Sequence, residues 1–260
     1  MKRFLSAFLM LALFACQKEK PKEETAPEVP PNAVCKVASI QEHPAVDGKS
    51  VLRTFTYDAA NRVIKMDIKN GSNPLVTKNI SYNGDGKIEK ITYNNGDYEM
   101  FTYTNGVVSG WETFNAAGLA LKKSALIYEN GRMVRENIYQ YNTATAAHEL
   151  KNYLVYEWEG AGNIANVKRF STADGIVGTD TYSYNTDKLN KQQTITPQLE
   201  LLFLNWSNDI TAFIYSKNLL KSVTSKKRNL VYEMNGAGWV TSIKTDKKDK
   251  LFDFTYGCSN

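Results

Sequence analysis

The side chains that could perform catalysis or hold a metal are few and scattered. The chain has two His and three Cys in 260 residues, and His43 and His148 are far apart in the sequence. No His-Glu-x-x-His or Cys-x-x-Cys spacing supports a zinc site. No Gly-x-Ser-x-Gly turn presents a serine nucleophile. The sequence therefore predicts no metal and no cofactor.

One carboxylate pair has a spacing that could serve glycoside hydrolysis. Glu157 and Glu159 flank Trp158, and in a strand residues i and i+2 point to the same face. Retaining glycosidases hold two carboxyl groups about 5 Å apart. Acidic residues on a solvated strand face are far commoner, so we expect no catalytic residues, and a glycan-degrading enzyme is the least favoured alternative.

Tryptophan side chains are the candidate ligand-binding groups, because indole faces stack on sugar rings and apolar ligands. The four are Trp111, Trp158, Trp206 and Trp239. Trp158 and Trp239 lie in Gly-rich turns, where we expect them to be exposed. The alternative is that each tryptophan fills the core or pins a turn.

The first 15 residues are typical of a secretory signal peptide. Lys2 and Arg3 precede an apolar run over residues 4–15, which is too short to span a bilayer as a helix, since that needs about 20 residues. The sequence Leu-Phe-Ala-Cys, ending at Cys16, resembles a bacterial lipobox. We predict cleavage before Cys16, lipid attachment there, and anchoring in a Gram-negative outer membrane, with the periplasmic and cell-surface faces both open.

Residues 16–33 are charged and Pro-rich, a composition that forms a flexible tether and not a packed core. The formal net charge of +5 includes the two cations of the signal peptide, and no basic block suits nucleic acid. We therefore expect a monomer held at the membrane by its lipid, with a glycan or an envelope protein as partner.

The remaining cysteines lie at the two ends of the predicted folded domain, residues 34–260. Cys35 is at its start and Cys258 near its end. Because an envelope compartment is oxidising, we hypothesise that they form a disulfide bond. Two free thiols are the alternative.

One repeated pattern dominates the chain from Val34 onward: an aromatic residue ends a short apolar stretch, and a Gly/Asn turn follows. The spacing of the aromatic residues, 10 to 15 residues, fits one strand and one turn. Six Asn-Gly pairs point to hairpins, because both residues tolerate positive φ. We expect roughly 12 to 16 strands. The aromatic residues between 82 and 184 are Tyr82, Tyr93, Tyr103, Phe114, Tyr128, Tyr141, Tyr156, Phe170 and Tyr184.

The predicted fold is all-β: an antiparallel up-and-down meander curled or closed into a barrel, since an open sheet of this length is uncommon. Alternation predicts that Ile64, Met66 and Ile68 share the buried face. One segment breaks the rhythm: Pro197 is followed by good helix formers, which predicts a short helix near 197–205.

The turns resemble a divergent form of the Tyr-Asp (YD) repeats of Rhs-type proteins, although only Tyr57-Asp58 keeps the Asp. The set is also similar to a family of bacterial envelope lipoproteins of unknown function with a porin-like β-fold, and shares a Ser-Lys-Asn-Leu stretch at 216–219. This resemblance covers about residues 35–258. It implies a fold and a location, but no activity.

Together these features predict a non-catalytic, lipid-anchored cell-envelope protein that binds a glycan, a peptide or another envelope partner. A carrier that holds a lipid or another apolar ligand inside the barrel is the first alternative. A membrane-spanning porin is a further alternative, because alternation alone does not say which face meets lipid. The anchor and the tether argue against it, since an integral barrel needs neither.

Overall fold

The structure is a computed structural model of the chain and describes residues 34–43, 50–190, 212 and 215–259. Five sequence predictions lie outside these residues: the signal peptide, lipid attachment at Cys16, the tether, the helix near 197–205, and ligand binding by Trp206.

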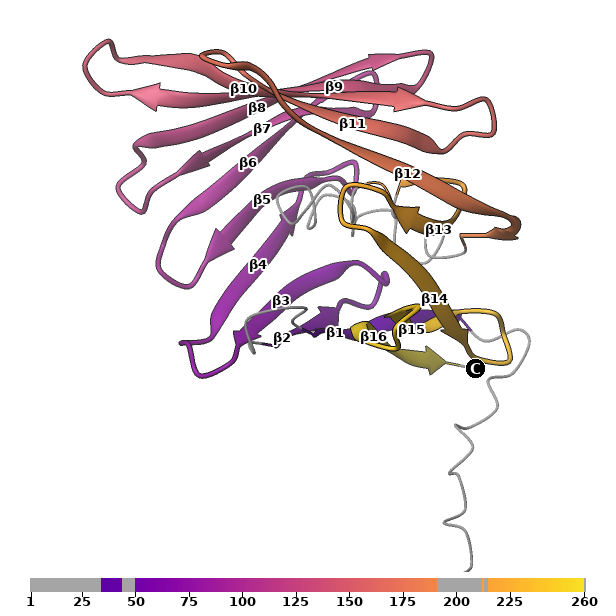
Figure 1. Cartoon of the computed structure of the whole chain (residues 1–260). Helices are drawn as coiled ribbons and strands as arrows, with labels where there is room; N and C mark the ends of the chain where they lie inside the picture. Colours follow the sequence, from indigo (N-terminus) through magenta and orange to yellow (C-terminus); the bar gives the residue numbers. More distant parts are fainter. Residues whose placement is uncertain (1–33, 44–49, 191–211, 213–214, 260) are drawn as a thin grey trace, which may run out of the picture.

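Sixteen antiparallel strands form one closed barrel, in which strands adjacent in sequence are also adjacent in the sheet (Figure 1). The last strand pairs with the first, which closes the barrel. The predicted all-β meander is therefore confirmed. The strands are β1 (Val34–Glu42), β2 (Val51–Tyr57), β3 (Val63–Asn70), β4 (Val76–Tyr82), β5 (Ile88–Tyr93), β6 (Tyr98–Thr104), β7 (Val107–Phe114), β8 (Ala120–Glu129), β9 (Arg132–Asn142), β10 (Ala147–Trp158), β11 (Ile164–Ser171), β12 (Gly175–Leu189), β13 (Asn218–Val223), β14 (Arg228–Met234), β15 (Val240–Thr245) and β16 (Lys250–Ser259).

The Asn-Gly pairs lie in hairpin turns, but they act in two ways. In the two-residue turns 105–106 and 130–131 both residues have positive φ, between 51° and 84°, as a tight hairpin turn requires. In the longer turn after β14, the Asn235 side chain accepts a hydrogen bond from the backbone N–H of Trp239 at 3.0 Å, and it is Gly238, at φ 78°, that takes the left-handed conformation.

In the hairpins whose turns follow Tyr57, Tyr82, Tyr103 and Tyr128, the register shifts at the tyrosine, and this shift decides which side chains point inward. In the β2–β3 hairpin the pairing shifts between Thr56 and Tyr57. As a result the buried positions of β3 are Val63 and then Met66, three residues on. Ile64 is 38% exposed, so the prediction that it faces the core is wrong, because simple alternation takes no account of the bulge.

The same three-residue step recurs around the barrel and builds two buried layers. A first layer lies next to the aromatic turns and consists of Val63, Ile88, Val108, Met133, Ile164, Leu220 and Val240. A second layer lies three residues further along each of these strands and consists of Met66, Ile91, Trp111, Glu136, Val167, Val223 and Ile243. The side chain at every one of these positions is apolar except Glu136.

A ring of hydrogen bonds, which we call the tyrosine ring, joins successive hairpins at this end of the barrel. In each bond an aromatic side chain donates to a backbone carbonyl of the preceding hairpin, 2.5 to 2.8 Å away. Nearly all the acceptors belong to first-layer residues, so the ring and the packed core share the same atoms. The bonds run from Tyr57 to Val37, Tyr82 to Val63, Tyr103 to Ile88, Trp158 to Met133, Tyr184 to Ile164, Tyr232 to Leu220 and Tyr256 to Val240.

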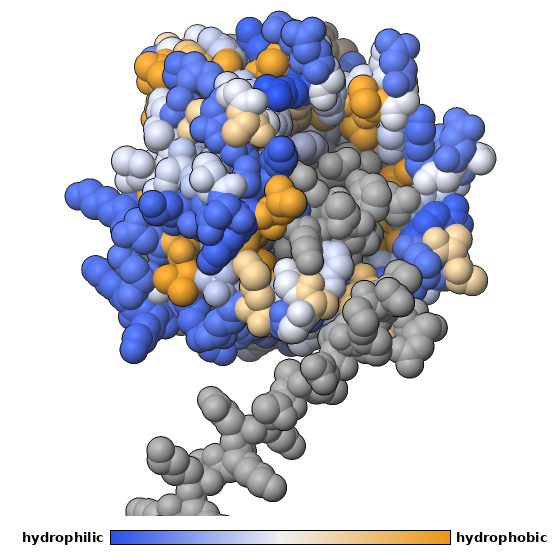
Figure 2. All heavy atoms as spheres, turned by 90° about the vertical axis from the view of Figure 1, so that its right-hand side faces the viewer, coloured by the Kyte–Doolittle hydropathy of each residue, from blue (hydrophilic) through white to orange (hydrophobic). Residues whose placement is uncertain are grey.

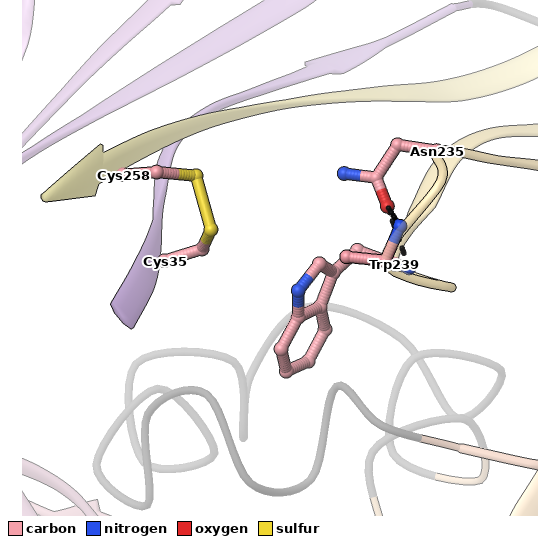
Figure 3. Close-up of a disulfide and its surroundings, with 5 residues drawn as sticks. Cys35, Asn235, Trp239 and Cys258 are labelled. Carbon is pink, nitrogen blue, oxygen red and sulfur yellow. Dashed lines mark hydrogen bonds between the residues drawn. A yellow bond between two sulfur atoms is a disulfide. The ribbon is translucent and has the colours of Figure 1, made fainter. Parts of the chain in front are cut away.

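A disulfide bond fastens the closing strands at the same end of the barrel (Figure 3). Cys35 on β1 lies directly opposite Cys258 on β16 in the antiparallel register. Their Cα atoms are 4.1 Å apart, and the two sulfur atoms are bonded. The predicted pairing of these cysteines is therefore confirmed in the structure.

Replacing Tyr82 by Phe should lower the free energy of unfolding by about 1–3 kcal/mol, because the Val63 carbonyl loses its donor. Burial raises the pKa of Tyr82 to about 12, so the hydroxyl donates at any ordinary pH. Urea denaturation measures the loss. Tyr98→Phe is the control, since the Tyr98 ring stacks on Phe114 with 4.9 Å between ring centroids and its hydroxyl has no hydrogen-bond partner among the described residues. Equal losses in both variants would contradict a role for the ring.

Removing the disulfide with Cys35→Ser and Cys258→Ser together should lower the thermal midpoint clearly. The bond closes a loop of 223 residues, for which the chain-entropy limit is about 5 kcal/mol. Calorimetry of the oxidised protein and the double variant measures the shift. In a Cys16→Ser background, a thiol assay of the unreduced protein should find none, and two reactive thiols would disprove the bond.

Candidate functional site

The outer face of the barrel carries charged side chains on several strands, interspersed with exposed apolar ones such as Leu121, Ile127 and Val231. Strand residues that point away from the buried layers form ion pairs, such as Lys65 with Asp67 at 2.7 Å on β3 and Lys244 with Glu233 across β15 and β14. On the closing strands, the Ser39 hydroxyl lies 2.7 Å from the Thr255 hydroxyl. Figure 2 shows one side of the molecule, where hydrophilic residues predominate and apolar ones are scattered. Charged groups therefore lie where a lipid-facing barrel has an apolar band.

The two glutamates considered for catalysis are each held by a neighbouring side chain. Glu157 lies on the outer face of β10, where it pairs with Lys168 and accepts a hydrogen bond from Asn166 at 2.9 Å. The hydrogen bond from Lys168 lowers the pKa of Glu157. Glu159 lies in the following turn and accepts a hydrogen bond from the Asn163 side chain. A glycosidase acid needs a raised pKa, and Glu157 has the opposite shift.

Trp158 and Trp111 are both enclosed by the protein to a greater extent than a stacking platform allows. Trp158 is half-buried, its indole N–H donates to the Met133 carbonyl at 2.8 Å, and the Arg132 guanidinium lies 5.5 Å from its ring centre. It therefore pins a turn as a member of the tyrosine ring, and the expectation that it is exposed is wrong. Trp111 belongs to the second buried layer and is 2% exposed, so its ring faces are covered.

Trp239 is also half-buried, not exposed as expected. Its ring centroid lies 6.3 Å from that of Tyr256 on β16. Figure 3 shows it projecting from the β14–β15 turn, with Asn235 accepting a hydrogen bond from its backbone. Of the three predicted tryptophans in the described residues, Trp111 is buried and Trp158 donates a hydrogen bond within the tyrosine ring. Trp239 is the one that is partly accessible and is not a donor in the tyrosine ring.

A different set of residues, on the inner face, does converge. Seven consecutive strands, β4 to β10, each contribute one polar side chain to the barrel interior at or just beyond the second buried layer. We call this set the polar arc, and it consists of Lys78, Tyr93, Glu99, Trp111, Ser124, Glu136 and Tyr156.

The first part of the polar arc is a cation, a phenol and a buried carboxylate. Lys78 Nζ lies 4.9 Å from the ring centroid of Tyr93, and the Tyr93 hydroxyl donates to Glu99 Oε1 at 2.8 Å. Burial lowers the pKa of Lys78, and the charge of Glu99 opposes that shift. Glu99 is 5% exposed, so its carboxylate depends on donors inside the barrel.

The second part is a buried carboxyl group with an unpaired indole beside it. The Ser124 hydroxyl donates to Glu136 Oε1 at 3.1 Å, and the Tyr156 hydroxyl lies 3.3 Å from Oε2. Trp111 pairs directly with Ser124 across β7 and β8. Its Nε1 is buried and has no hydrogen-bond partner in the described chain. Burial raises the pKa of Glu136 to about 7, despite opposing contributions from Ser124, Lys122 and Tyr156.

Exposure increases along the inner wall from the second layer toward the barrel end opposite the tyrosine ring. On β9 Glu136 is buried, Ile138 is half-buried and Gln140 is exposed, and all three point to the same face. On β4 Ile80 is buried and Val76 is 38% exposed. The polar arc therefore lies where the packed core gives way to solvent, and we call this open end the mouth.

Of the polar arc, sequence reasoning named only Trp111 as a binding candidate and missed its carboxyl groups and Lys78, although two signals were present. Lys78 and Glu99 each lie four residues before a turn tyrosine, Tyr82 and Tyr103 respectively. Side chains two and four residues before the tyrosine lie on the same face of the strand as the tyrosine. This rule would have placed Lys78 and Glu99 inside the barrel. Glu136 would have stood out in an alignment of the repeats, because it is the one charged residue in the second layer.

Within residues 34–43, 50–190, 212 and 215–259, no group of three or more His, Cys, Asp or Glu side chains is placed to hold a metal ion. No helix in the same residues is long and apolar enough to cross a membrane.

Known proteins resemble this chain in fold and not in sequence. No protein-family model and no curated protein matches the sequence. A solved structure of a porin-like protein from Bacteroides uniformis is similar, with a TM-score of 0.58 and 14% identity over 85% of this chain and 98% of that one. A porin-like protein from Bacteroides vulgatus has a TM-score of 0.53 with the same identity and coverage. The porin-like fold implied by the sequence resemblance is therefore confirmed, whereas the lipoprotein assignment and the Tyr-Asp repeats stay predictions.

Replacing Glu136 by Gln should change how stability depends on pH. Because the pKa of Glu136 is raised in the folded state, its protonated form fits the fold, and the native protein loses stability as pH rises from about 4.5 to 7. The free energy of unfolding of the variant lacks that decrease. Between pH 5 and pH 8 the difference in unfolding free energy between the variant and the native chain should therefore shift in the variant's favour by up to about 3 kcal/mol.

Urea denaturation at several pH values measures this difference. Glu89→Gln is the matched control, because Glu89 is exposed on β5, and it should follow the native chain throughout. A pH profile for Glu136→Gln parallel to that of the native chain would rule out a raised pKa at this site.

Proposed function

We propose that the chain is a non-catalytic, lipid-anchored protein of the bacterial cell envelope, whose water-exposed barrel binds an envelope ligand at its mouth. The observation that carries this proposal is the polarity of the barrel: apolar layers inside, and ion pairs on the outer face of β3, β10–β11 and β14–β15. A barrel that spans a membrane has the reverse arrangement, with an apolar band outside and a polar interior. The barrel therefore needs a separate means of attachment, which the lipobox at Cys16 would supply.

The absence of catalysis is part of the same proposal. The carboxylate with spacing suited to glycoside hydrolysis, Glu157, pairs with Lys168 on the outer face and not in a pocket. Within the described chain, the polar arc contains no His and no Cys, and its two carboxyl groups, Glu99 and Glu136, are buried and hydrogen-bonded to hydroxyl groups. Binding is therefore the chemistry that the described side chains support.

A carrier that holds an apolar ligand inside the barrel is the second candidate, favoured by the apolar layers beneath the mouth. Both buried layers are closed in the folded chain. An apolar ligand would therefore have to lie between these layers and the mouth, against the polar arc. Native mass spectrometry of the protein as isolated would find a stoichiometric apolar adduct if this candidate were correct.

Cell fractionation tests the anchor and the barrel separately. The native chain should sediment with the outer membrane and require detergent for release. A variant with residues 1–16 replaced by a signal peptide that is cleaved without lipid attachment should be soluble in the periplasm. Mass spectrometry of the native N-terminal peptide should show an acylated Cys16.

A known integral barrel, fractionated in parallel, should need detergent with or without such a change. If the unlipidated variant also stays in the membrane until detergent is added, the barrel itself spans the bilayer and the proposal fails. If Cys16 carries no lipid in the native chain, the anchor is wrong.

A further inference from the structure

We propose that the polar arc binds a neutral, hydroxyl-rich ligand, such as the terminal sugar of a glycan, which enters through the mouth. This inference rests on the proposed binding function and names its ligand class. It is carried by a buried indole donor without an acceptor on β7, which lies between buried carboxylates on β6 and β9.

The unpaired donor is the Nε1–H of Trp111. Its side chain is 2% exposed, and Nε1 has no hydrogen-bond partner among the described residues. Buried donors in folded proteins are nearly always paired, so each exception calls for an acceptor. Trp111 lies opposite Ser124 in the β7–β8 register, and Ser124 donates to Glu136 on β9, so the three residues stand on neighbouring strands of the same inner wall.

The two carboxylates call for donors in turn. Tyr93 reaches one oxygen of Glu99, which leaves the second oxygen free to accept another hydrogen bond. Ser124 and Tyr156 reach the two oxygens of Glu136, and each oxygen has capacity for a second donor. A ligand for this site must therefore donate to carboxylates and accept from an indole.

Hydroxyl groups do both, and a sugar carries several of them at fixed angles. Lys78 adds a further donor at the β4 end of the arc. Ile91 of the second buried layer, together with the buried side chains of Phe101 on β6 and Leu126 on β8, supplies an apolar surface for the C–H face of a ring. Charge also separates the two candidate ligands, since a fatty-acid carboxylate would meet the buried carboxylate of Glu99, whereas a neutral sugar would not be repelled.

The mouth leads to the inner wall beside the arc, and because Glu99, Trp111, Ser124, Glu136 and Tyr156 are buried in this structure, a ligand reaches them only when neighbouring inner-wall side chains move aside. The residues beyond the arc on the same inner face, such as Gln140 and Asn152, are exposed. The arc lies on the mouth side of the tyrosine ring, two residues from a ring donor at Tyr156 and three from a ring acceptor at Glu136, but no arc side chain donates or accepts one of the ring's hydrogen bonds. Variants in the arc should therefore leave the ring intact.

Isothermal titration of the full-length protein tests the proposal, with glucose, galactose, mannose, N-acetylglucosamine, cellobiose and maltose as neutral probes and laurate as the anionic one. We expect at least one saccharide to bind and laurate not to bind. Trp111→Phe, which keeps the ring and removes the N–H, should weaken that binding several-fold. Glu99→Gln should weaken it about tenfold, as expected for a lost hydrogen bond to a charged acceptor.

The control variants are Glu157→Gln on the outer face of β10 and Glu89→Gln, which is exposed on β5, both of which should bind like the native chain. Lys78→Met is a second arc variant in case Glu99→Gln does not fold, as judged by its thermal midpoint. Saccharide binding that none of the arc variants weakens would overturn the site. Binding of laurate and of no saccharide would overturn the ligand class. Neither result affects the fractionation test, so the anchored barrel and the sugar site fail or succeed separately.

Discussion

Successive hairpins of this barrel are tied together by one kind of hydrogen bond, from a turn aromatic residue to a backbone carbonyl of the hairpin before it. A bulge interrupts the regular hydrogen bonding between two strands. A buried backbone carbonyl group at such a place needs another donor. Tyr57, Tyr82 and Tyr103 supply these donors from consecutive turns. The same bulge sets the three-residue step between buried layers. Turn chemistry, hydrogen bonding and core packing therefore depend on the same aromatic positions, and the repeat is conserved in form around the barrel although its residues vary.

Local features of the sequence predicted the fold well, because hairpin turns are decided by a few adjacent residues. The Asn-Gly pairs and the spacing of the aromatic residues predicted the hairpins, the approximate number of strands and the up-and-down order of the strands. Two predictions needed contacts that are distant in sequence. The outward position of Ile64 follows from a bulge against β2, and Trp158 is half-buried because its N–H finds the Met133 carbonyl on β9. The interior carboxylates escaped notice for a related reason: a charged residue in an alternating strand reads as solvent-facing until its register is known.

Carboxyl groups can be buried inside the barrel because each strand of the polar arc contributes one polar side chain, and neighbouring side chains form hydrogen bonds with one another. Tyr93 serves Glu99, and Ser124 serves Glu136, so two carboxylates are buried without a cation bonded to either. Burial of that kind is costly unless hydrogen bonds compensate it, and the raised pKa of Glu136 shows that compensation there is incomplete. The first layer, near the tyrosine ring, has no such groups. Packing therefore stabilises one end of the barrel, while the other end keeps polar groups available for binding.

The position of β1 determines at which end of the barrel a lipid-anchored chain would enter the fold. β1 begins at the tyrosine ring, where Cys35 is bonded to Cys258, and runs toward the mouth. A tether that joins Cys16 to Val34 therefore leaves the barrel at the end opposite the polar arc. Eighteen residues extend to at most about 60 Å, which is enough to hold the barrel clear of the bilayer. If Cys16 carries the lipid, as proposed, the chain from the lipid enters the barrel at the disulfide-fastened end, and the mouth is the end further from that entry along β1.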